Sequence, residues 1–520
     1  MSLTGEPLAS CLPAERALVF VGFMAAGKST VARLAAEHLG WRFLDADRLI
    51  EGRAGRPISR IFTEDGEARF RALEEEVTLE LLDGPGGRVL ALGGGAVSHP
   101  RVRAALARHL VVWLDVELDT AWERVDGTAR PLARDRREFA RLHAQREPLY
   151  AALADVTLPA ERGREVAAVL DALRGAPRGT RMLWATSDSQ DYPVYLAGGL
   201  ITRERFWPAG LEGRRFLLSD GNVAHLYAHA LEPLAARVTV TPGEQSKTVA
   251  HADIVWSELA RAGMTRRDVV VALGGGVVGD LAGFCAATYQ RGVRHVQAPT
   301  TLVAQVDSAY GGKTGVDLPE AKNYVGAYHQ PAAVLVDPDT LDTLPAPELA
   351  AGYAEVVKTA LIAGGGLWEA VRAGADPRSP EVILACARTK LRIVARDERD
   401  DGPRQVLNLG HTVGHALETV TGYARYRHGE AVGLGLLVAL RLSGQEELRR
   451  EVAELLARWG LPTRLEGVDP DAVVLAAARD KKRVGEGPVP FVLLERPGAP
   501  RPGCVVESRA LIAAVRELAA

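Results

Sequence analysis

A glycine-rich loop between an expected strand and an expected helix constrains this chain more than any other feature. The apolar run Ala17–Val21 leads directly into Gly22-Phe23-Met24-Ala25-Ala26-Gly27-Lys28-Ser29-Thr30. This is a complete GxxxxGK[ST] pattern, in which backbone N–H groups and a helix N-terminus bind phosphates. We therefore expect an α/β unit that binds a nucleoside triphosphate with Mg²⁺ through Gly27, Lys28, Ser29 and Thr30, with Ser29 as a ligand of the metal ion.

The size and charge of the chain exclude several classes of protein. Its 520 residues exceed what one hydrophobic core holds, and its 47% hydrophobic content is that of globular proteins. A formal net charge of -3 gives no basic surface for nucleic acid. The cysteines form no CxxC motif, so we expect no disulfide and no cysteine zinc site, and we place the chain in a reducing cytoplasm; the four are Cys11, Cys285, Cys386 and Cys504.

One long apolar stretch resembles a membrane span. Residues 269–287 are apolar apart from Asp280, but five glycines interrupt them, and the rest of the chain offers no second candidate. We interpret this stretch as a buried strand, a glycine turn and a helix. We expect no membrane partner.

The chain divides into three segments. From Ala17 to Leu173, short apolar runs alternate with amphipathic stretches, which predicts a parallel sheet with flanking helices, and the turn residues 175–179 close this domain. We assign residues 1–178 to it and residues 179–345 to a second α/β part. Residues 346–520 are mostly helical, with helices predicted over Ile383–Arg396, Ala431–Leu442 and Glu446–Trp459. The cleft between the last two segments is a natural site.

Polar residues follow other strands of the first segment. Asp45 and Asp47 come after a short apolar run, where carboxylates bind Mg²⁺ through water or accept hydroxyl protons; they could equally cap a helix. Gly93-Gly94-Gly95 is a second strand-to-glycine turn, and residues 127–132 have the composition of a lid over phosphate. Arg71 and Arg146 could each bind a carboxylate or lie on the surface.

Together these motifs strongly resemble the shikimate kinase family over nearly all of residues 16–174. The resemblance rests on the glycine loop, Asp45-Ala46-Asp47, Phe70-Arg71, the glycine triplet, Arg130-Pro131-Leu132 and Arg146-Glu147-Pro148-Leu149-Tyr150. It implies that Lys28 and Arg130 act on ATP, and that Asp47 orients the 3-hydroxyl of shikimate and takes its proton. It places around shikimate Asp47, Arg71, Gly94 and Arg146. Ala25 departs from the family, which commonly has glycine there.

The second segment contains a weaker glycine motif. Gly274-Gly275-Gly276-Val277-Val278-Gly279 satisfies GxGxxG after an expected strand, but the acid expected about 20 residues further on is not clear. The turn can still bind a pyrophosphate, because that requires only backbone N–H donors and close approach.

The third segment contains histidines with the spacing of metal ligands. His411 and His415 are four residues apart and share one helix face, and His428 follows. Such pairs also occur as helix-surface residues, so the spacing alone leaves a metal site and a surface helix open. A zinc metalloprotease is disfavoured because Thr412 stands where its glutamate base should be. Lys313 beside glycines and Lys358 three residues after Glu355 suggest an anion site.

At this point residues 190–500 closely resemble the 3-dehydroquinate synthase family. The matching stretches are Pro242-Gly-Glu-Gln-Ser-Lys247, residues 274–280, 299–302 and 311–315, Asp307, Lys322-Asn323, Glu355-Val-Val-Lys358, Asn408-Leu-Gly-His411, His415 and His428-Gly-Glu430. The resemblance implies Glu355, His411 and His428 as zinc ligands, with Co²⁺ as an alternative ion. His415 would be a nearby active-site residue that does not bind the metal.

The same resemblance implies the remaining roles. NAD would be held by Glu244, Lys247, Gly275, Gly276, Asp280, Thr300, Thr301, Lys313 and Lys322. The substrate would be contacted by Arg291, Asp307, Lys313, Asn323, Lys358, Lys390, Arg404, Asn408 and one of Lys481 and Lys482, of which we prefer Lys482. It also implies a homodimer formed through this half.

The two resemblances imply a bifunctional enzyme of aromatic amino-acid biosynthesis. One reaction is the ATP-dependent phosphorylation of shikimate, and the other converts 3-deoxy-D-arabino-heptulosonate 7-phosphate to 3-dehydroquinate and phosphate. The alternative is an ATP-sensing domain joined to a metal- and NAD-dependent polyol dehydrogenase.

Overall fold

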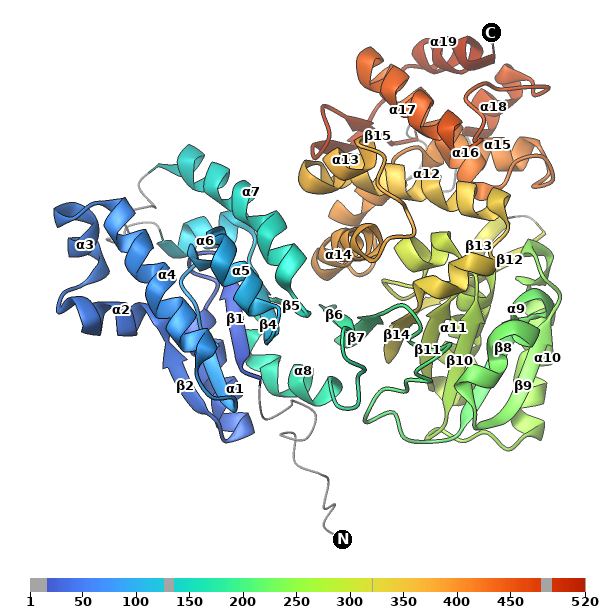
Figure 1. The fold of residues 1–520 in the computed structure, drawn as a ribbon. Coiled ribbons are helices and arrows are strands. Elements are labelled where there is room, and N and C mark those ends of the chain that lie inside the picture. Colours follow the sequence, from blue (N-terminus) through green and yellow to red (C-terminus); the bar gives the residue numbers. More distant parts are fainter. Residues whose placement is uncertain (1–15, 126–134, 320, 478–488, 520) are drawn as a thin grey trace. The chain divides into compact units, whose positions relative to one another are not determined.

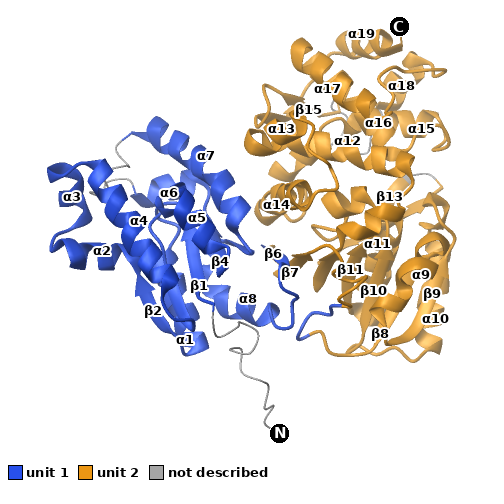
Figure 2. Ribbon diagram, in the orientation of Figure 1, with its two compact units in different colours: residues 1–184, 206–210 blue, residues 185–205, 211–520 orange. Residues whose placement is uncertain are grey.

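The computed structural model describes residues 16–125, 135–319, 321–477 and 489–519, which form two compact units. The first comprises residues 1–184 and 206–210, and the second residues 185–205 and 211–520 (Figure 2). The division falls six residues after the expected end of the first domain at residue 178. The reason is strand β6 (Arg181–Ala185), which pairs in parallel with β5 (Val156–Pro159) of the first unit.

The first unit is built on a parallel sheet. Its strand order is β2 (Arg42–Asp45), β3 (Arg88–Ala91), β1 (Leu18–Gly22), β4 (Leu110–Asp115), β5 and β6. Strands β1 and β4 are buried along their whole length, as the apolar runs of the sequence predict for a sheet covered on both faces. The predicted α/β fold of this unit is confirmed (Figure 1).

Eight α-helices flank this sheet in the described residues. Helices α1 and α8 pack together, and α4 packs against α2, α3 and α5. Their bounds are α1 Lys28–Leu39, α2 Ala46–Ala54, α3 Ile58–Glu64, α4 Glu67–Asp83, α5 Pro100–Leu106, α6 Leu118–Val125, α7 Arg136–Leu153 and α8 Val166–Ala172.

The second unit begins with another parallel sheet. Its order is β7 (Tyr192–Leu196), β14 (Ala333–Val336), β11 (Arg294–Pro299), β10 (Val269–Gly274), β8 (Arg215–Asp220) and β9 (Leu234–Val240). The associated helices are α9 (Gly221–Tyr227), α10 (Val249–Arg261) and α11 (Gly276–Thr288). The apolar stretch 269–287 is thus strand β10, a glycine turn and helix α11, as predicted. No helix in the described part of the chain is long and apolar enough to cross a bilayer.

The rest of the second unit is mainly helical, as predicted, and gathers at one end of that unit (Figure 1). Its helices are α12 Ala346–Ala363, α13 Gly365–Arg372, α14 Pro380–Arg396, α15 His411–Val420, α16 His428–Leu442, α17 Glu446–Arg458, α18 Pro470–Ala477 and α19 Ser508–Ala519, with a short strand pair β15 Phe491–Leu494 and β16 Pro500–Cys504. The sequence did not predict the antiparallel hairpin β12 (Lys313–Leu318) and β13 (Ala321–Tyr328), which precedes them. Cys285, Cys386 and Cys504 are free thiols, and Cys11 lies outside the described residues.

Candidate active sites

The glycine loop of the first unit has the geometry of a phosphate cradle. Gly22 ends β1 at φ 149°, and a Cβ built there would lie 2.6 Å from the carbonyl oxygen of Leu114 on β4, so only glycine fits. Helix α1 begins at Lys28 after Gly27 in the left-handed conformation. The Lys28 ammonium donates to the carbonyl oxygens of Gly22 and Phe23, both at 3.0 Å. The loop therefore surrounds the lysine and places the N-terminus of α1, at Lys28 and Ser29, where an anion binds favourably, while the Thr30 N–H donates to the carbonyl oxygen of Gly27 at 3.0 Å.

Ala25 in this loop has a backbone conformation that favours glycine, with φ 60°. Left-handed backbone costs an L-residue about 1–2 kcal/mol. We expect Ala25→Gly to stabilise the first unit by about 0.5–1 kcal/mol, because the relieved strain exceeds the extra entropy of glycine in the unfolded chain. This effect is measured as the rate of thermal inactivation of the kinase. The rate of inactivation of the synthase in the same tube is the reference. The matched control Ala26→Gly, at a buried neighbour without positive φ, should instead destabilise the same unit. A faster inactivation of the Ala25→Gly kinase would contradict the strain argument.

The two carboxylates after β2 have different roles. The Asp45 side chain accepts from the backbone N–H groups of Asp47 and Arg48, at 3.0 and 3.4 Å, and so caps α2. Asp47, two residues further on, faces the glycine triplet, since a Cβ built on Gly93 would lie 3.0 Å from Asp47 Oδ1. The structure therefore makes Asp45 the helix cap and places Asp47 beside the glycine triplet.

A buried acidic residue on α4, Glu74, organises the cations next to Asp47. Arg71 donates to Glu74 Oε2 at 2.6 Å. A Cβ on Gly95 would lie 1.9 Å from Arg71 Nη1, and a Cβ on Gly93 would lie 2.5 Å from Glu74 Oε1. The glycine triplet is therefore required for this close approach. Burial raises the pKa of Glu74, but His99 and Arg71 outweigh burial and hold it below its usual value.

Arg146 on α7 completes this group. It is buried, and its Nε has no hydrogen-bond partner among the described residues. The Tyr150 hydroxyl, one turn further on, donates to the carbonyl oxygen of Gly94 at 2.6 Å and so connects α7 to the triplet. Arg71 is already paired with Glu74 and Glu67, at 2.6 and 3.0 Å, whereas Arg146 Nε keeps a donor that no described residue uses and that suits an anionic group of a substrate.

Sequence reasoning missed Glu74, although a signal was present. Phe70, Leu73, Val77 and Leu81 form the buried face of α4, and Glu74 is an acidic residue on that same face. A charge in such a position is almost always paired. Arg130, the expected lid arginine, lies outside the described residues.

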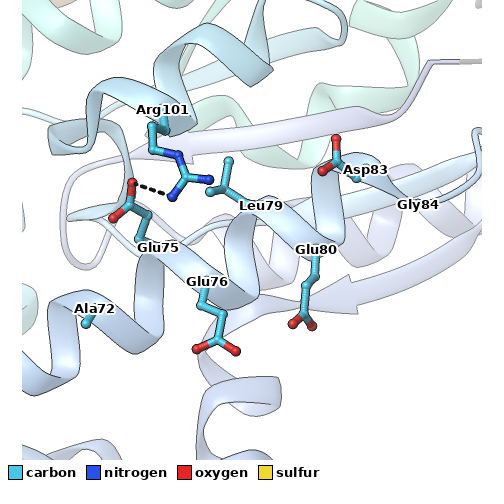
Figure 3. Close-up of a pocket in the computed structure, with 8 residues that line it drawn as sticks. All are labelled: Ala72, Glu75, Glu76, Leu79, Glu80, Asp83, Gly84 and Arg101. Carbon is cyan, nitrogen blue, oxygen red and sulfur yellow. Dashed lines mark ion pairs between the residues drawn. The ribbon is translucent and has the colours of Figure 1, made fainter.

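A separate pocket of about 530 Å³ lies along α4 and contains none of the predicted site residues (Figure 3). Its acidic side chains are neutralised by arginines: Glu75 pairs with Arg101, Glu80 with Arg53 and Asp83 with Arg108. We assign no chemistry to it.

Three residues of the second unit form a candidate metal centre. Glu355 lies on α12, and His411 and His428 begin α15 and α16. Each offers one ligand atom, and these atoms lie within 4.8 Å of one another. His428 Nε2 is 3.3 Å and His411 Nε2 is 3.7 Å from Glu355 Oε1.

The burial and the partners of the Glu355 carboxylate test whether a metal ion fits this site. Its carboxylate is completely buried, and neither oxygen accepts a hydrogen bond of regular geometry from the described residues. Its one close cation is the Lys358 ammonium, 2.5 Å from Oε2. A buried carboxylate whose close partner is one ammonium is costly, and a divalent cation would satisfy its other oxygen, Oε1, which faces both histidines. Two histidines and one glutamate are the ligand set of catalytic zinc sites.

Each histidine ring has an oxygen atom next to its Nδ1, on the side away from Glu355. His411 Nδ1 lies 3.2 Å from the carbonyl oxygen of Leu409, and His428 Nδ1 lies 3.4 Å from Glu418 Oε1. Contacts of this kind fix the other nitrogen, Nε2, toward a metal. The His415 ring is 5.3 Å from that of His411 but lies outside the ligand cluster. The geometry thus favours the metal interpretation of the histidine spacing.

Two lysines, buried Lys358 and partly buried Lys390, converge on Asp307 next to this centre. Lys358 Nζ lies 3.1 Å from Asp307 Oδ2. Lys390 donates to the Asp307 carbonyl oxygen at 2.7 Å and pairs with Oδ1. Burial raises the pKa of Asp307, but Lys358 and Lys390 outweigh burial and hold it well below its usual value. Burial and the nearby Arg404 and Lys358 lower the pKa of Lys390. The cluster therefore places two cations beside the metal ligands.

The glycine turn after β10 lies close to residues 301–308. A Cβ on Gly275 would lie 2.9 Å from Thr301 Cγ2, and one on Gly276 would lie 3.0 Å from Ser308 Oγ. Buried Lys247 pairs with Asp280 at 2.5 Å near the N-terminus of α11. Thr300 Oγ1 is buried and has no hydrogen-bond partner in the described part of the chain. These residues meet at a helix N-terminus, where a pyrophosphate binds favourably.

Other predicted residues lie outside this cluster or have structural partners. Arg291 is exposed and follows the C-terminus of α11, the opposite end from the glycine turn. Arg404 is buried and donates to the carbonyl oxygens of Glu398 and Gly311. Lys313 pairs with Asp400. Asn323 is exposed, and Asn408 is partly buried just before α15. Lys481 and Lys482 lie outside the described residues.

Lysine itself is a rare residue here. The chain has 63 lysine and arginine residues, of which only eight are lysine: Lys28, Lys247, Lys313, Lys322, Lys358, Lys390, Lys481 and Lys482. Arginine therefore supplies nearly all of the positive side-chain charge. All six lysines in the described ranges are among the predicted site residues and have polar partners there. This pattern disfavours the alternative of idle surface lysines.

Comparisons with known proteins agree with both halves. The shikimate kinase family model matches residues 24–174. The models for the N-terminal and C-terminal parts of 3-dehydroquinate synthase match residues 237–351 and 352–483. A 3-dehydroquinate synthase of Symbiobacterium thermophilum is 46% identical over an alignment of 336 positions, and the match covers 59% of this chain and 92% of that protein.

Solved structures are also similar. A 2-epi-5-epi-valiolone synthase from Streptomyces hygroscopicus, with NAD⁺ and Zn²⁺ bound, is 25% identical with a TM-score of 0.58, covering 64% of this chain and 98% of that one. A shikimate kinase from Acinetobacter baumannii, in complex with shikimate, is 34% identical with a TM-score of 0.29, covering 32% of this chain and 94% of that one. The family models and the 3-dehydroquinate synthase relative, together with the P-loop and the candidate metal centre, lead to one conclusion: the chain is an enzyme that belongs to the shikimate kinase family in its N-terminal part and to the 3-dehydroquinate synthase family in its C-terminal part.

Proposed function

We propose that the first unit transfers the γ-phosphoryl group of ATP to the 3-hydroxyl of shikimate. The observation that carries this proposal is the convergence of Asp47, Arg71 and Arg146 on the glycine triplet, in the same unit as Lys28. Arg71 and Arg146 would bind the substrate carboxylate by charge-assisted hydrogen bonds. Asp47 would orient the hydroxyl and accept its proton, and Ser29 would hold Mg²⁺. Lys28 would neutralise charge on the transferred group.

We propose that the second unit converts 3-deoxy-D-arabino-heptulosonate 7-phosphate to 3-dehydroquinate and phosphate. The supporting observation is the Glu355, His411 and His428 cluster next to Lys358 and Lys390. The names of the relatives and the NAD⁺ and Zn²⁺ in the similar valiolone synthase support these cofactors for this chain, with Co²⁺ as an alternative ion.

The residues of the second unit have separable tasks. Bound NAD would supply reversible hydride acceptance, and bound metal would supply Lewis acidity at the substrate hydroxyls. Glu355, His411 and His428 would hold the metal, and the glycine turn with Lys247 and Asp280 would hold the dinucleotide. Lys358 and Lys390, fixed by Asp307, would bind anionic groups of the substrate and stabilise charge on the departing phosphate. His415 lies close enough to the cluster to exchange a proton with a substrate hydroxyl.

One preparation assayed for both reactions tests the proposal. We expect ADP formation that requires shikimate, and phosphate release from the heptulosonate phosphate that needs NAD⁺ without net NADH. NADH accumulating with product would instead identify a polyol dehydrogenase. ATP binding without phosphorylated shikimate would identify a sensor domain.

A further inference from the structure

Glu418 on α15 connects the candidate metal centre to a charge outside it. Its side chain is buried, and one of its oxygens has two partners. Glu418 Oε1 lies 3.4 Å from His428 Nδ1 and 3.3 Å from Lys322 Nζ. Glu418 is therefore a carboxylate whose charge is shared between a metal ligand and an ammonium group.

Lys322 reaches Glu418 from a different part of the unit. It lies on β13, and its ammonium also lies 3.2 Å from Glu244 Oε1 and 4.4 Å from the centre of the Tyr423 ring. Glu244 begins a short 3₁₀ turn before α10. Lys322 is thus shared between two carboxylates, one from the α/β part and one from the helical part.

We propose that Glu418 is a positioning residue for the metal ligand His428, and that Lys322 limits how much negative charge Glu418 supplies to that ligand. This inference rests on the proposed metal site. Glu418 has no contact with the metal position itself, since the ligand cluster contains only Glu355, His411 and His428. It acts through the Nδ1 side of the imidazole.

Removal of the charge of Glu418 and removal of the charge of Lys322 should change metal affinity in opposite directions. A carboxylate at Nδ1–H holds the ring in one tautomer and makes Nε2 a stronger ligand. A lysine on the same oxygen withdraws part of that charge and adds a positive charge near a dication. Removing the carboxylate should weaken metal binding, whereas removing the ammonium should strengthen it. If the salt bridge had a purely structural role, removing either partner would change metal affinity in the same direction.

Metal affinity of the full-length protein tests this inference without any activity assay. Zn²⁺ affinity would be measured by competition with a chelator, and the visible absorption of the Co²⁺ form would report ligand geometry. Glu418→Gln keeps the size and an acceptor oxygen but loses the charge, and should weaken Zn²⁺ binding about 10–100-fold, as is typical when the partner of a metal ligand is changed. Lys322→Met should tighten Zn²⁺ binding several-fold.

A matched control makes the same charge change elsewhere in the helical part. Glu451 on α17 pairs with Arg372 at 2.5 Å and has no described contact with the metal ligands, so Glu451→Gln should leave Zn²⁺ affinity unchanged. Equal affinities for wild type and Glu418→Gln, or weaker binding in Lys322→Met, would overturn the inference. Failure of the wild type to bind Zn²⁺ or Co²⁺ would instead overturn the proposed metal site. Thermal melting of the metal-free variants separates these outcomes from misfolding.

Discussion

Lys28→Met is expected to abolish phosphorylation of shikimate and to leave dehydroquinate formation unchanged. Lys28 is the only lysine before Lys247 in the sequence, and its ammonium is held by the carbonyl oxygens of Gly22 and Phe23 within the glycine loop. Methionine keeps the apolar stem and removes the charge. Loss of one preorganised charge of this kind costs about 10²–10³ in turnover. The synthase site has its own lysines and needs no ATP. Both activities should be measured on one preparation.

Arg33→Met is the matched control for this experiment. Arg33 is an exposed cation on the same helix α1, next to the ring of Phe43. Its replacement should leave both activities near wild type. If synthase activity fell together with kinase activity in Lys28→Met while thermal melting showed an intact fold, the two sites would have to be coupled.

His411→Ala and His428→Ala are each expected to lose bound metal and synthase activity, whereas His415→Ala should keep most of its metal and lose activity. The reason is the geometry of the centre: Nε2 of His411 and of His428 faces Glu355 Oε1, and His415 lies outside the ligand cluster. Loss of a ligand should weaken binding by at least the roughly 10–100-fold that a change in its hydrogen-bond partner costs. Metal analysis of the three purified variants measures the difference.

Kinase activity is the internal control for the histidine variants, because the kinase site lies in the other compact unit and should be unaffected. Equal loss of metal in all three variants would show that His415 is also a ligand. Retention of metal in His428→Ala would remove His428 from the ligand set.

Local rules of sequence determined most of the fold and the position of the nucleotide loop. The apolar runs at β1, β4 and β10 are buried strands because parallel sheets covered on both faces need continuous apolar residues. The glycine loop and α1 follow from covalent neighbours alone, since Gly22 and Gly27 supply backbone conformations that other residues avoid. The hairpin β12–β13 was not predicted because its glycines and charges obscure the strand alternation.

Only the tertiary structure decided how the site residues pair. The spacing of the histidines left a metal centre and a surface helix open. Buried Glu355 from α12, whose carboxylate lies within 4.8 Å of the ligand atoms of His411 and His428, favours the metal centre. Glu74 and Glu418 had no motif, because a carboxylate becomes functional through partners that packing brings to it.

The same limit applies to position along a helix. Asp45 and Asp47 look alike in sequence, yet the first caps α2 and the second faces the glycine triplet. Arg291 lies in a short 3₁₀ turn after the C-terminus of α11, whereas the glycine turn lies at the N-terminus of that helix. Sequence patterns encode what each residue does to its own backbone and its near neighbours. Pairing of charges depends on contacts between distant segments, and these exist only once the chain is folded.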